Sequence, residues 1–190
     1  MSNPGEENAT PIDSVQQLAA TLAAGARPRA EYRIGTEHEK FGFYRSGPRA
    51  FQSPPYEPAG IHAMLEGIAE RGWEPITDQG NLIGLKANGE SVSLEPGGQF
   101  ELSGAPVVTI HDTKAELDRH FADVRAVAGP LGLGFAPIGF HPTASRDAQP
   151  FMPKSRYAIM RRYMPKVGSM GLDMMFRTCL LYTSPSPRDS

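Results

Sequence analysis

The chain has 190 residues, of which 39% are hydrophobic and 8% aromatic, and its formal net charge is −2. This length suffices for one domain with a buried core, and no stretch approaches the ~20 consecutive apolar residues of a membrane-spanning helix. The single cysteine, Cys179, excludes an intrachain disulfide framework and a thiolate metal site. Because the acidic N-terminus lacks the apolar segment of a secretory signal, we expect a cytoplasmic protein.

The first elements along the chain are a disordered segment and a helix. Residues 1–12 contain no hydrophobic periodicity and are expected to be disordered. Residues 13–24 are predicted to form an amphipathic helix, with Asp13 or Ser14 as its N-cap and Gly25 at its end.

A strand is predicted over 31–44, followed by a proline-rich loop and a helix over about 59–71. Ile61, Leu65 and Ile68 lie on one face of that helix. Glycines then separate four short strands that form a meander. These strands are expected near 73–77, 81–86, 91–95 and 99–103.

The last third of the chain is predicted to hold a long helix, a strand and a basic helix. The long helix spans 112–128 with Asp112 as its cap, and its buried stripe is formed by Leu117, Phe121, Val124 and Val127. A strand is expected over 132–140 and the basic helix over about 155–163. Together the elements predict an α+β fold with a largely antiparallel sheet, helices on one face and carboxylates on the other.

Residues 91–101 are the source of the predicted carboxylate face. Because strand side chains alternate with a period of two, Glu95 and Glu101 share one face of a hairpin that turns at Pro96-Gly97-Gly98. The opposite face carries the apolar side chains Val92, Leu94, Phe100 and Leu102. Two carboxylates held close together repel unless a cation or a proton intervenes.

A second carboxylate pair lies in the strand at 31–44. Glu37 and Glu39 project to the same face, roughly 7 Å apart at Cα, whereas His38 points the other way and is interpreted as a packing or surface residue. Four glutamates from neighbouring strands are typical of a Mg²⁺ site, because Mg²⁺ prefers oxygen ligands and combines carboxylates with substrate phosphates. The alternative is a solvated face with structural salt bridges to late arginines.

Charge is distributed unevenly along the chain. Acidic residues outnumber basic ones up to residue 145, whereas residues 146–177 have an excess of basic side chains. Lysine and arginine are the usual partners of phosphate, so an acidic part followed by a basic segment suits a metal-bound polyphosphate. A solvated basic helix is the alternative, and nucleic acid is disfavoured because the basic segment is short.

Four long segments carry a resemblance to a known family: 34–43, 93–106, 152–160 and 163–179. Together they resemble the plant and proteobacterial type of glutamate–cysteine ligase. The resemblance runs from about residue 13 to residue 179 and implies a catalytic domain with the curved antiparallel sheet of glutamine synthetase. It also implies ATP and Mg²⁺ as requirements, and glutamate, cysteine and ATP as small-molecule partners, with no nucleic acid or membrane.

The resemblance implies roles for seven residues. Glu37, Glu39, Glu95 and Glu101 match the carboxylates that hold Mg²⁺. The basic residues that match candidates for neutralising phosphate or substrate carboxylate are Lys154, Arg156 and Arg162. The sequence assigns no further nucleotide-binding residues.

The end of the chain departs from the family pattern. One frame of a common transposase-based sequencing adaptor encodes residues 179–189, so residues 180–190 are interpreted as a non-native tail. Residues 13–179 are then the N-terminal part of the ligase domain, and we expect this chain alone to be inactive. The remaining alternatives are a non-catalytic Mg²⁺- or nucleotide-binding module and a ligase that joins glutamate to another amine.

Overall fold

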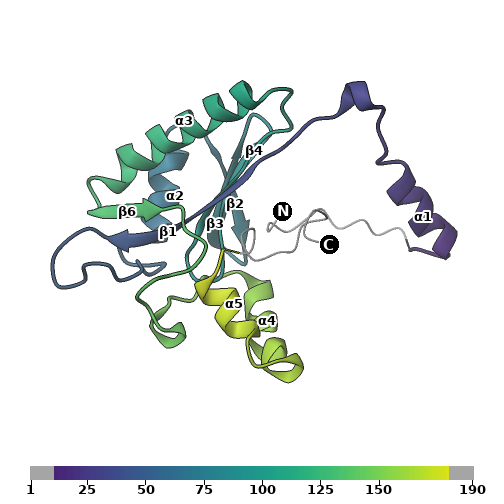
Figure 1. The fold of residues 1–190 in the computed structure, drawn as a ribbon. Coiled ribbons are helices and arrows are strands. Elements are labelled where there is room, and N and C mark those ends of the chain that lie inside the picture. Colours follow the sequence, from purple (N-terminus) through teal and green to yellow (C-terminus); the bar gives the residue numbers. More distant parts are fainter. Residues whose placement is uncertain (1–10, 180–190) are drawn as a thin grey trace.

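The computed structural model describes residues 11–179, and its centre is a six-stranded sheet in the order β2-β3-β4-β5-β1-β6 (Figure 1). Neighbouring strands are antiparallel throughout. The sheet is open, with β2 and β6 at its edges, which confirms the predicted α+β class. The strands are β1 (Glu37–Tyr44), β2 (Glu74–Asp78), β3 (Asn81–Ala87), β4 (Glu90–Leu94), β5 (Phe100–Ser103) and β6 (Leu133–Ala136).

Two helices cover one face of this sheet (Figure 1). Two others lie near the turn between β4 and β5, where Gly97 packs against Phe176. The covering helices are α2 (Ile61–Ala69) and α3 (Ile110–Ala128), and the helices near the turn are α4 (Ser155–Val167) and α5 (Gly171–Arg177). Helix α1 (Val15–Ala23) stands away from the sheet, has no buried residue, and is capped by Ser14 as predicted. Two short 3₁₀ turns occupy Arg29–Glu31 and Arg146–Ala148.

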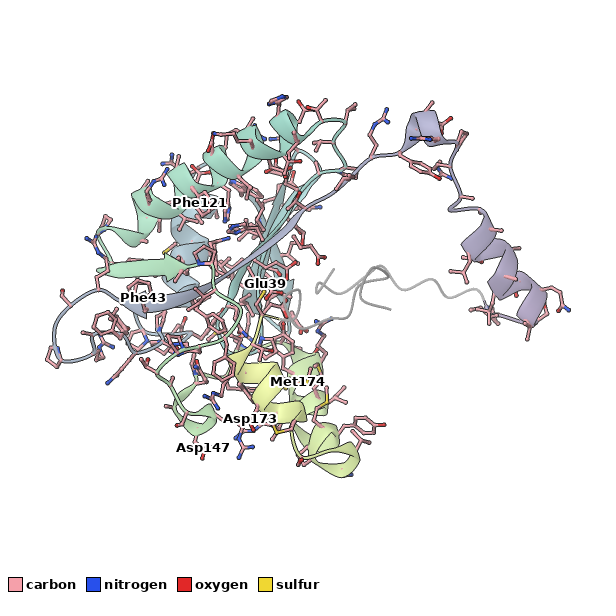
Figure 2. The ribbon with its side chains drawn as sticks, in the orientation of Figure 1. Glu39, Phe43, Phe121, Asp147, Asp173 and Met174 are labelled. Atoms are coloured by element: carbon pink, nitrogen blue, oxygen red, sulfur yellow. The ribbon has the colours of Figure 1, made fainter. Side chains whose placement is uncertain are left out.

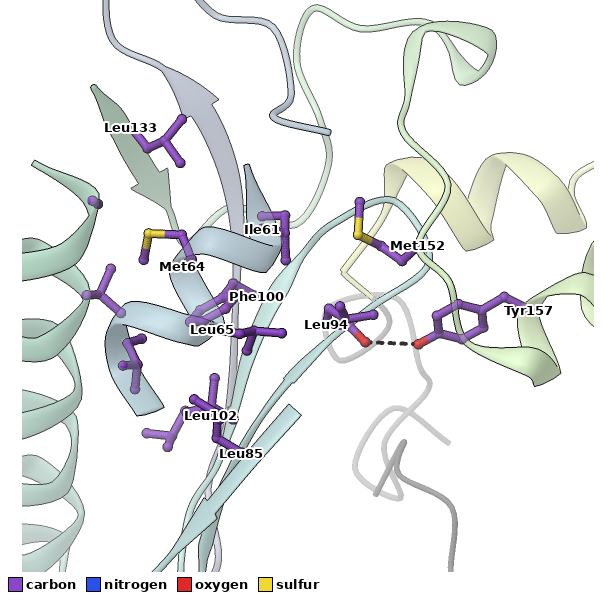
Figure 3. Packing of buried hydrophobic residues seen from close by; sticks show 14 of the residues in the cluster. Ile61, Met64, Leu65, Leu85, Leu94, Phe100, Leu102, Leu133, Met152 and Tyr157 are labelled. Carbon is purple, nitrogen blue, oxygen red and sulfur yellow. Dashed lines mark hydrogen bonds between the residues drawn. The ribbon is translucent and has the colours of Figure 1, made fainter. Parts of the chain in front are cut away.

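The hydrophobic core lies between the sheet and helices α2 and α3 (Figure 3). Ile61, Leu65 and Ile68 of α2 are buried in it, as the spacing of these residues predicts. The apolar face of the β4–β5 hairpin is also completely buried, and it consists of Val92, Leu94, Phe100 and Leu102. The predicted division of this hairpin into an apolar and a carboxylate face is therefore confirmed.

The prediction for α3 is wrong in two respects. The helix begins two residues earlier, at Ile110, because Thr109 is the N-cap and Asp112 occupies the third helical position of a capping box. Of the predicted stripe only Val124 is fully buried; the other fully buried residues are Glu116, His120 and Ala128, so the buried stripe is rotated from the apolar stripe that hydrophobicity predicts. Leu117 and Val127 pack only at the margin of the core.

Other element boundaries also differ from the predictions. Strand β1 begins at Glu37 rather than residue 31, although Ile34 forms an isolated antiparallel bridge with Val107 before it. Strand β6 covers only the first half of 132–140, and α4 continues through Pro165 to Val167. Helix α5 was not predicted.

Two predictions fall mainly outside the described residues. The non-native tail at 180–190 and the disordered segment up to residue 10 are not described, and residues 11 and 12 have no regular secondary structure. None of the helices within residues 11–179 is long and apolar enough to span a membrane.

Candidate functional site

The strand register gathers the four predicted glutamates on the face of the sheet opposite α2 and α3. Glu39 of β1 lies directly opposite Glu101 of β5, and Glu37 lies opposite Ser103. Glu95 follows β4, where its backbone N–H donates to the carbonyl oxygen of Gln99 at 2.8 Å. Figure 2 shows Glu39 on the central part of the sheet. The predicted carboxylate face is thus present, with contributions from β1, β5 and the end of β4.

Three of these carboxylates are buried. Glu39 is 7% exposed, whereas Glu95 and Glu101 are each 5% exposed; Glu37 is exposed. Burial raises the pKa of Glu101 to about 7. The negative charges of Glu95 and Glu37 add to this increase, whereas a hydrogen bond from Ser103 opposes it. Near neutral pH, a substantial fraction of Glu101 is therefore protonated in the absence of a cation.

Glu95 is held by residues from α4. The hydroxyl group of Tyr157 lies 3.2 Å from Glu95 Oε2 and 3.0 Å from the carbonyl oxygen of Leu94, the contact drawn in Figure 3. Lys154 Nζ lies 3.9 Å from the other carboxylate oxygen, Glu95 Oε1. That oxygen is buried and accepts no hydrogen bond from the described residues.

The three predicted basic residues occupy different environments. Lys154 is buried, and burial lowers its pKa to about 8, although the negative charge of Glu95 acts to raise it. Arg156 is exposed, with its guanidinium carbon 5.3 Å from the centre of the Tyr157 ring. Arg162 is also exposed. Of the three, Lys154 is the residue whose ion pair joins α4 to the glutamates, and the roles of Arg156 and Arg162 stay predictions.

The carboxylate face suits Mg²⁺ in donor type but is not a complete metal cage. Within residues 11–179, no three side chains of His, Cys, Asp or Glu converge closely enough to hold a metal ion by themselves. Mg²⁺ does not require such a cage, because it keeps several waters and is commonly bound by one or two carboxylates together with substrate phosphates. The buried Glu95 Oε1 is an oxygen available to such an ion.

Two of the late arginines, Arg146 and Arg177, form ion pairs with aspartates. Arg146 pairs with Asp147 and Asp173, and Arg177 also pairs with Asp173. Their ion pairs therefore lie within the C-terminal part of the described chain, away from the glutamate set.

Three further residues lie beside or beneath the carboxylates, and sequence reasoning gave none of them a functional role. Gln99 accepts a hydrogen bond from Gly97 N–H and donates to the carbonyl oxygen of Thr178, which ties the hairpin turn to the segment after α5. Its place on the carboxylate face follows from strand alternation, so that signal was available. The other two, Tyr157 and the buried Lys40 on the opposite face, could not be identified from local pattern alone.

Named plant proteins are similar to most of this chain. It is 54% identical over 165 residues to "Glutamate--cysteine ligase, chloroplastic" of Medicago truncatula, a match that covers 86% of this chain and 32% of that protein. It is 51% identical over 181 residues to the protein of the same name from Arabidopsis thaliana, a match that covers 94% of this chain and 34% of that protein. The chain therefore spans about a third of the length of the curated relatives it matches.

The names of these relatives contradict the expected cytoplasmic location. Both are named chloroplastic, as is "Glutamate--cysteine ligase A, chloroplastic" of Oryza sativa subsp. japonica, which points to a plastid. The expectation was wrong because it rested on the lack of a secretory signal. Transit peptides to plastids are amphipathic and do not contain the apolar segment of such a signal.

A family-wide comparison agrees with the pairwise ones. The family model described as glutamate-cysteine ligase family 2 (GCS2) matches residues 33–183, most of the chain. The matched range includes all four glutamates and the three predicted basic residues. The chain belongs to the glutamate–cysteine ligase family 2.

Proposed function

We propose that this chain forms the N-terminal part of the catalytic domain of an ATP-dependent ligase that joins L-glutamate to L-cysteine, the first step of glutathione synthesis. Membership of the family and the names of the relatives support the reaction. The structural observation that carries the proposal is the register that sets Glu39 directly opposite Glu101, with Glu95 beside them.

The proposed reaction has two steps. An oxygen of the γ-carboxylate of glutamate attacks the γ-phosphorus of ATP, the bond to the bridging oxygen breaks, and ADP leaves from the resulting γ-glutamyl phosphate. The amine of cysteine then attacks the acyl carbon, loses a proton, and displaces inorganic phosphate. Both steps bring anionic groups together, so catalysis depends on positioning and on charge stabilisation.

In this proposal the chain contributes charges of both signs. Glu37, Glu39, Glu95 and Glu101 hold Mg²⁺, which when bound offsets the negative charge of the transferring phosphoryl group. Lys154 is buried next to Glu95, so its ammonium group is placed to face phosphate oxygens at the same ion. Arg156 and Arg162, exposed on the same helix, are the candidates for a more distant carboxylate or phosphate of the substrates.

We further propose that the 190-residue chain does not catalyse the reaction alone. It spans about a third of its relatives, and its carboxylate face lacks three convergent protein ligands within residues 11–179. The rest of the relatives' length is expected to supply further contacts to ATP and to the amino-acid substrates.

The test is a ligase assay on the protein encoded by the complete reading frame. We expect formation of γ-glutamylcysteine that requires both ATP and Mg²⁺, and a loss of about 10²–10³-fold in kcat for Glu39→Gln. The matched control is Glu70→Gln, an exposed glutamate at the end of α2, which should leave kcat unchanged. Full activity of Glu39→Gln would refute the proposed site.

Two other outcomes distinguish the alternative functions. Turnover with another amine, but not with cysteine, would identify a different glutamate ligase. Binding of ATP and Mg²⁺ without product from any amine would identify a non-catalytic binding module.

A further inference from the structure

Tyr157 connects α4 to the carboxylate face through a buried hydroxyl group. Its side chain is completely buried, and its ring belongs to the same apolar cluster as Leu94 and Met152 (Figure 3). A buried phenol needs a hydrogen-bond partner, and here the hydroxyl faces two acceptors of the β4–β5 hairpin, Leu94 O at 3.0 Å and Glu95 Oε2 at 3.2 Å.

The start of α4 is anchored at two turns of the sheet, which fixes the position of Tyr157. The Ser155 N–H donates to Asp78 Oδ2 at the end of β2, at 2.6 Å. The Met152 N–H donates to the carbonyl oxygen of Pro96, in the turn that follows Glu95, at 3.2 Å. The same turn is packed so closely against α5 that a Cβ atom on Gly97 would lie 2.4 Å from the carbonyl oxygen of Phe176.

This anchoring fixes the orientation of one carboxylate. The single hydroxyl proton of Tyr157 is shared between Leu94 O and Glu95 Oε2, and this contact to Oε2 restrains rotation of the Glu95 carboxylate. Oε1 is buried, has no hydrogen bond from the described residues, and lies 3.9 Å from Lys154 Nζ.

We propose that Tyr157 is a positioning residue for the metal site: its hydroxyl group orients Glu95 so that Oε1 is presented to a divalent cation shared with Glu101. This inference rests on the proposed function, because it requires that the carboxylate face binds a cation. Hydrogen-bond partners that orient metal ligands typically contribute 10–100-fold to metal affinity. Tyr157 is therefore expected to affect metal binding without touching the metal.

The test uses Mn²⁺, an oxygen-preferring ion whose free form is measured by electron paramagnetic resonance. Titration of the 190-residue chain should show Mn²⁺ binding that Tyr157→Phe weakens about tenfold. Tyr163→Phe is the matched control, because Tyr163 lies on the same helix and is 58% exposed; it should bind Mn²⁺ like the unchanged chain. Circular dichroism and thermal unfolding establish that each variant is folded.

A double-mutant cycle separates orientation of Glu95 from a general structural role. In a Glu95→Gln background, Tyr157→Phe should cause no further loss of Mn²⁺ affinity, because its effect passes through the carboxylate. An equal loss in both backgrounds would overturn the proposal. If Tyr157→Phe does not fold, Glu95→Asp is used instead, because it keeps the negative charge but moves the carboxylate away from the Tyr157 hydroxyl group. An unchanged Mn²⁺ affinity of Glu95→Asp would also overturn the proposal.

The outcomes also separate this proposal from the proposed function. If the unchanged chain binds no Mn²⁺, the metal site fails and the positioning role fails with it. If the chain binds Mn²⁺ and Tyr157→Phe binds it equally well, only the role of Tyr157 is refuted.

Discussion

Both faces of the central sheet bury ionisable side chains, but in different groupings: Lys40 and His120 lie together beneath α3, whereas Glu39, Glu95 and Glu101 lie together on the opposite face. Lys40, which alternates with Glu39 along β1, is 1% exposed beneath α3, with its Nζ 3.1 Å from His38 Nδ1 and 2.9 Å from the carbonyl oxygen of His38. His120 of α3 is buried beside it. Glu39, Glu95 and Glu101 are buried to a similar degree on the other side.

Burial shifts the pKa values of the bases beneath α3 and of Glu101 on the opposite face in the directions that favour their neutral forms. Burial lowers the pKa of Lys40 to about 7 and that of His120 to about 2. Burial likewise raises the pKa of Glu101 to about 7. Lys40 and His120 both lie against the Phe121 ring of α3, and buried side-chain atoms without a hydrogen bond from the described residues occur on both faces, at His120 Nε2 and at Glu95 Oε1. We interpret the face beneath α3 as structural, and we propose that a cation completes the acidic face.

The largest expected effect concerns metal binding on the acidic face. The double substitution Glu39→Gln and Glu101→Gln should weaken Mn²⁺ binding by the 190-residue chain more than about 100-fold, because it removes two charged ligands that face each other across β1 and β5. Electron paramagnetic resonance titration measures the change. The metal-free double variant should unfold at the same or a higher temperature, since it relieves repulsion between buried carboxylates.

The control for that experiment is the pair Glu66→Gln and Glu70→Gln on the exposed side of α2. These substitutions change the net charge equally but should leave Mn²⁺ affinity unchanged. Equal losses in both double variants would show that Mn²⁺ responds only to overall charge.

The next effect concerns stability on the basic face. Lys40→Met should increase the free energy of unfolding at pH 7 by about 1–3 kcal/mol, because it replaces a buried ionisable group with an apolar side chain of similar length. Urea denaturation measures the change, and Lys86→Met, at a lysine whose side chain is 62% exposed, should change little. A destabilised Lys40→Met variant would mean that the charge of Lys40 supports the fold.

The smallest effect is a pair of opposite pH dependences. The folded-state pKa of Glu101 is raised from 4.5 to about 7, so its contribution to stability is present below pH 4.5 and is lost as the pH rises to 7. The pKa of His120 is lowered from 6.5 to about 2, so its contribution is present above pH 6.5 and is lost as the pH falls. Between pH 4.5 and 6.5 the two groups therefore act with opposite sign.

Urea denaturation at pH 5 and pH 7 resolves these contributions. Relative to the unchanged chain, Glu101→Gln should be more stable at pH 7 than at pH 5, and His120→Leu should show the reverse preference. Parallel shifts at both pH values for either variant would contradict the assigned protonation.

The division of the sheet into two faces could be predicted from the sequence because it depends on local alternation. The hairpin at 91–101 has a fixed period of two and a glycine-containing turn, so the positions of Glu95 and Glu101 follow from their spacing. The pairing of Glu39 with Glu101 also depends on which strands become neighbours. The sequence suggested that arrangement only through the presence of two carboxylate pairs.

The features that could not be predicted depend on contacts between distant segments. Hydrophobicity places Phe121 in the buried stripe of α3, but Glu116 and His120 take the fully buried positions. Glu116 accepts a hydrogen bond from the Ala105 N–H, and His120 stacks near Phe100. The contact between Tyr157 and Glu95 joins residues 62 positions apart and has no local pattern.

The most direct test of the central claim is anomalous diffraction from crystals of the 190-residue chain grown with Mn²⁺. We expect an anomalous peak on the carboxylate face, within about 2.5 Å of oxygens from Glu101 and at least one of Glu39 and Glu95. A peak bound only elsewhere on the molecule, or no peak with the glutamates well ordered, would contradict the assignment of this face as a metal site.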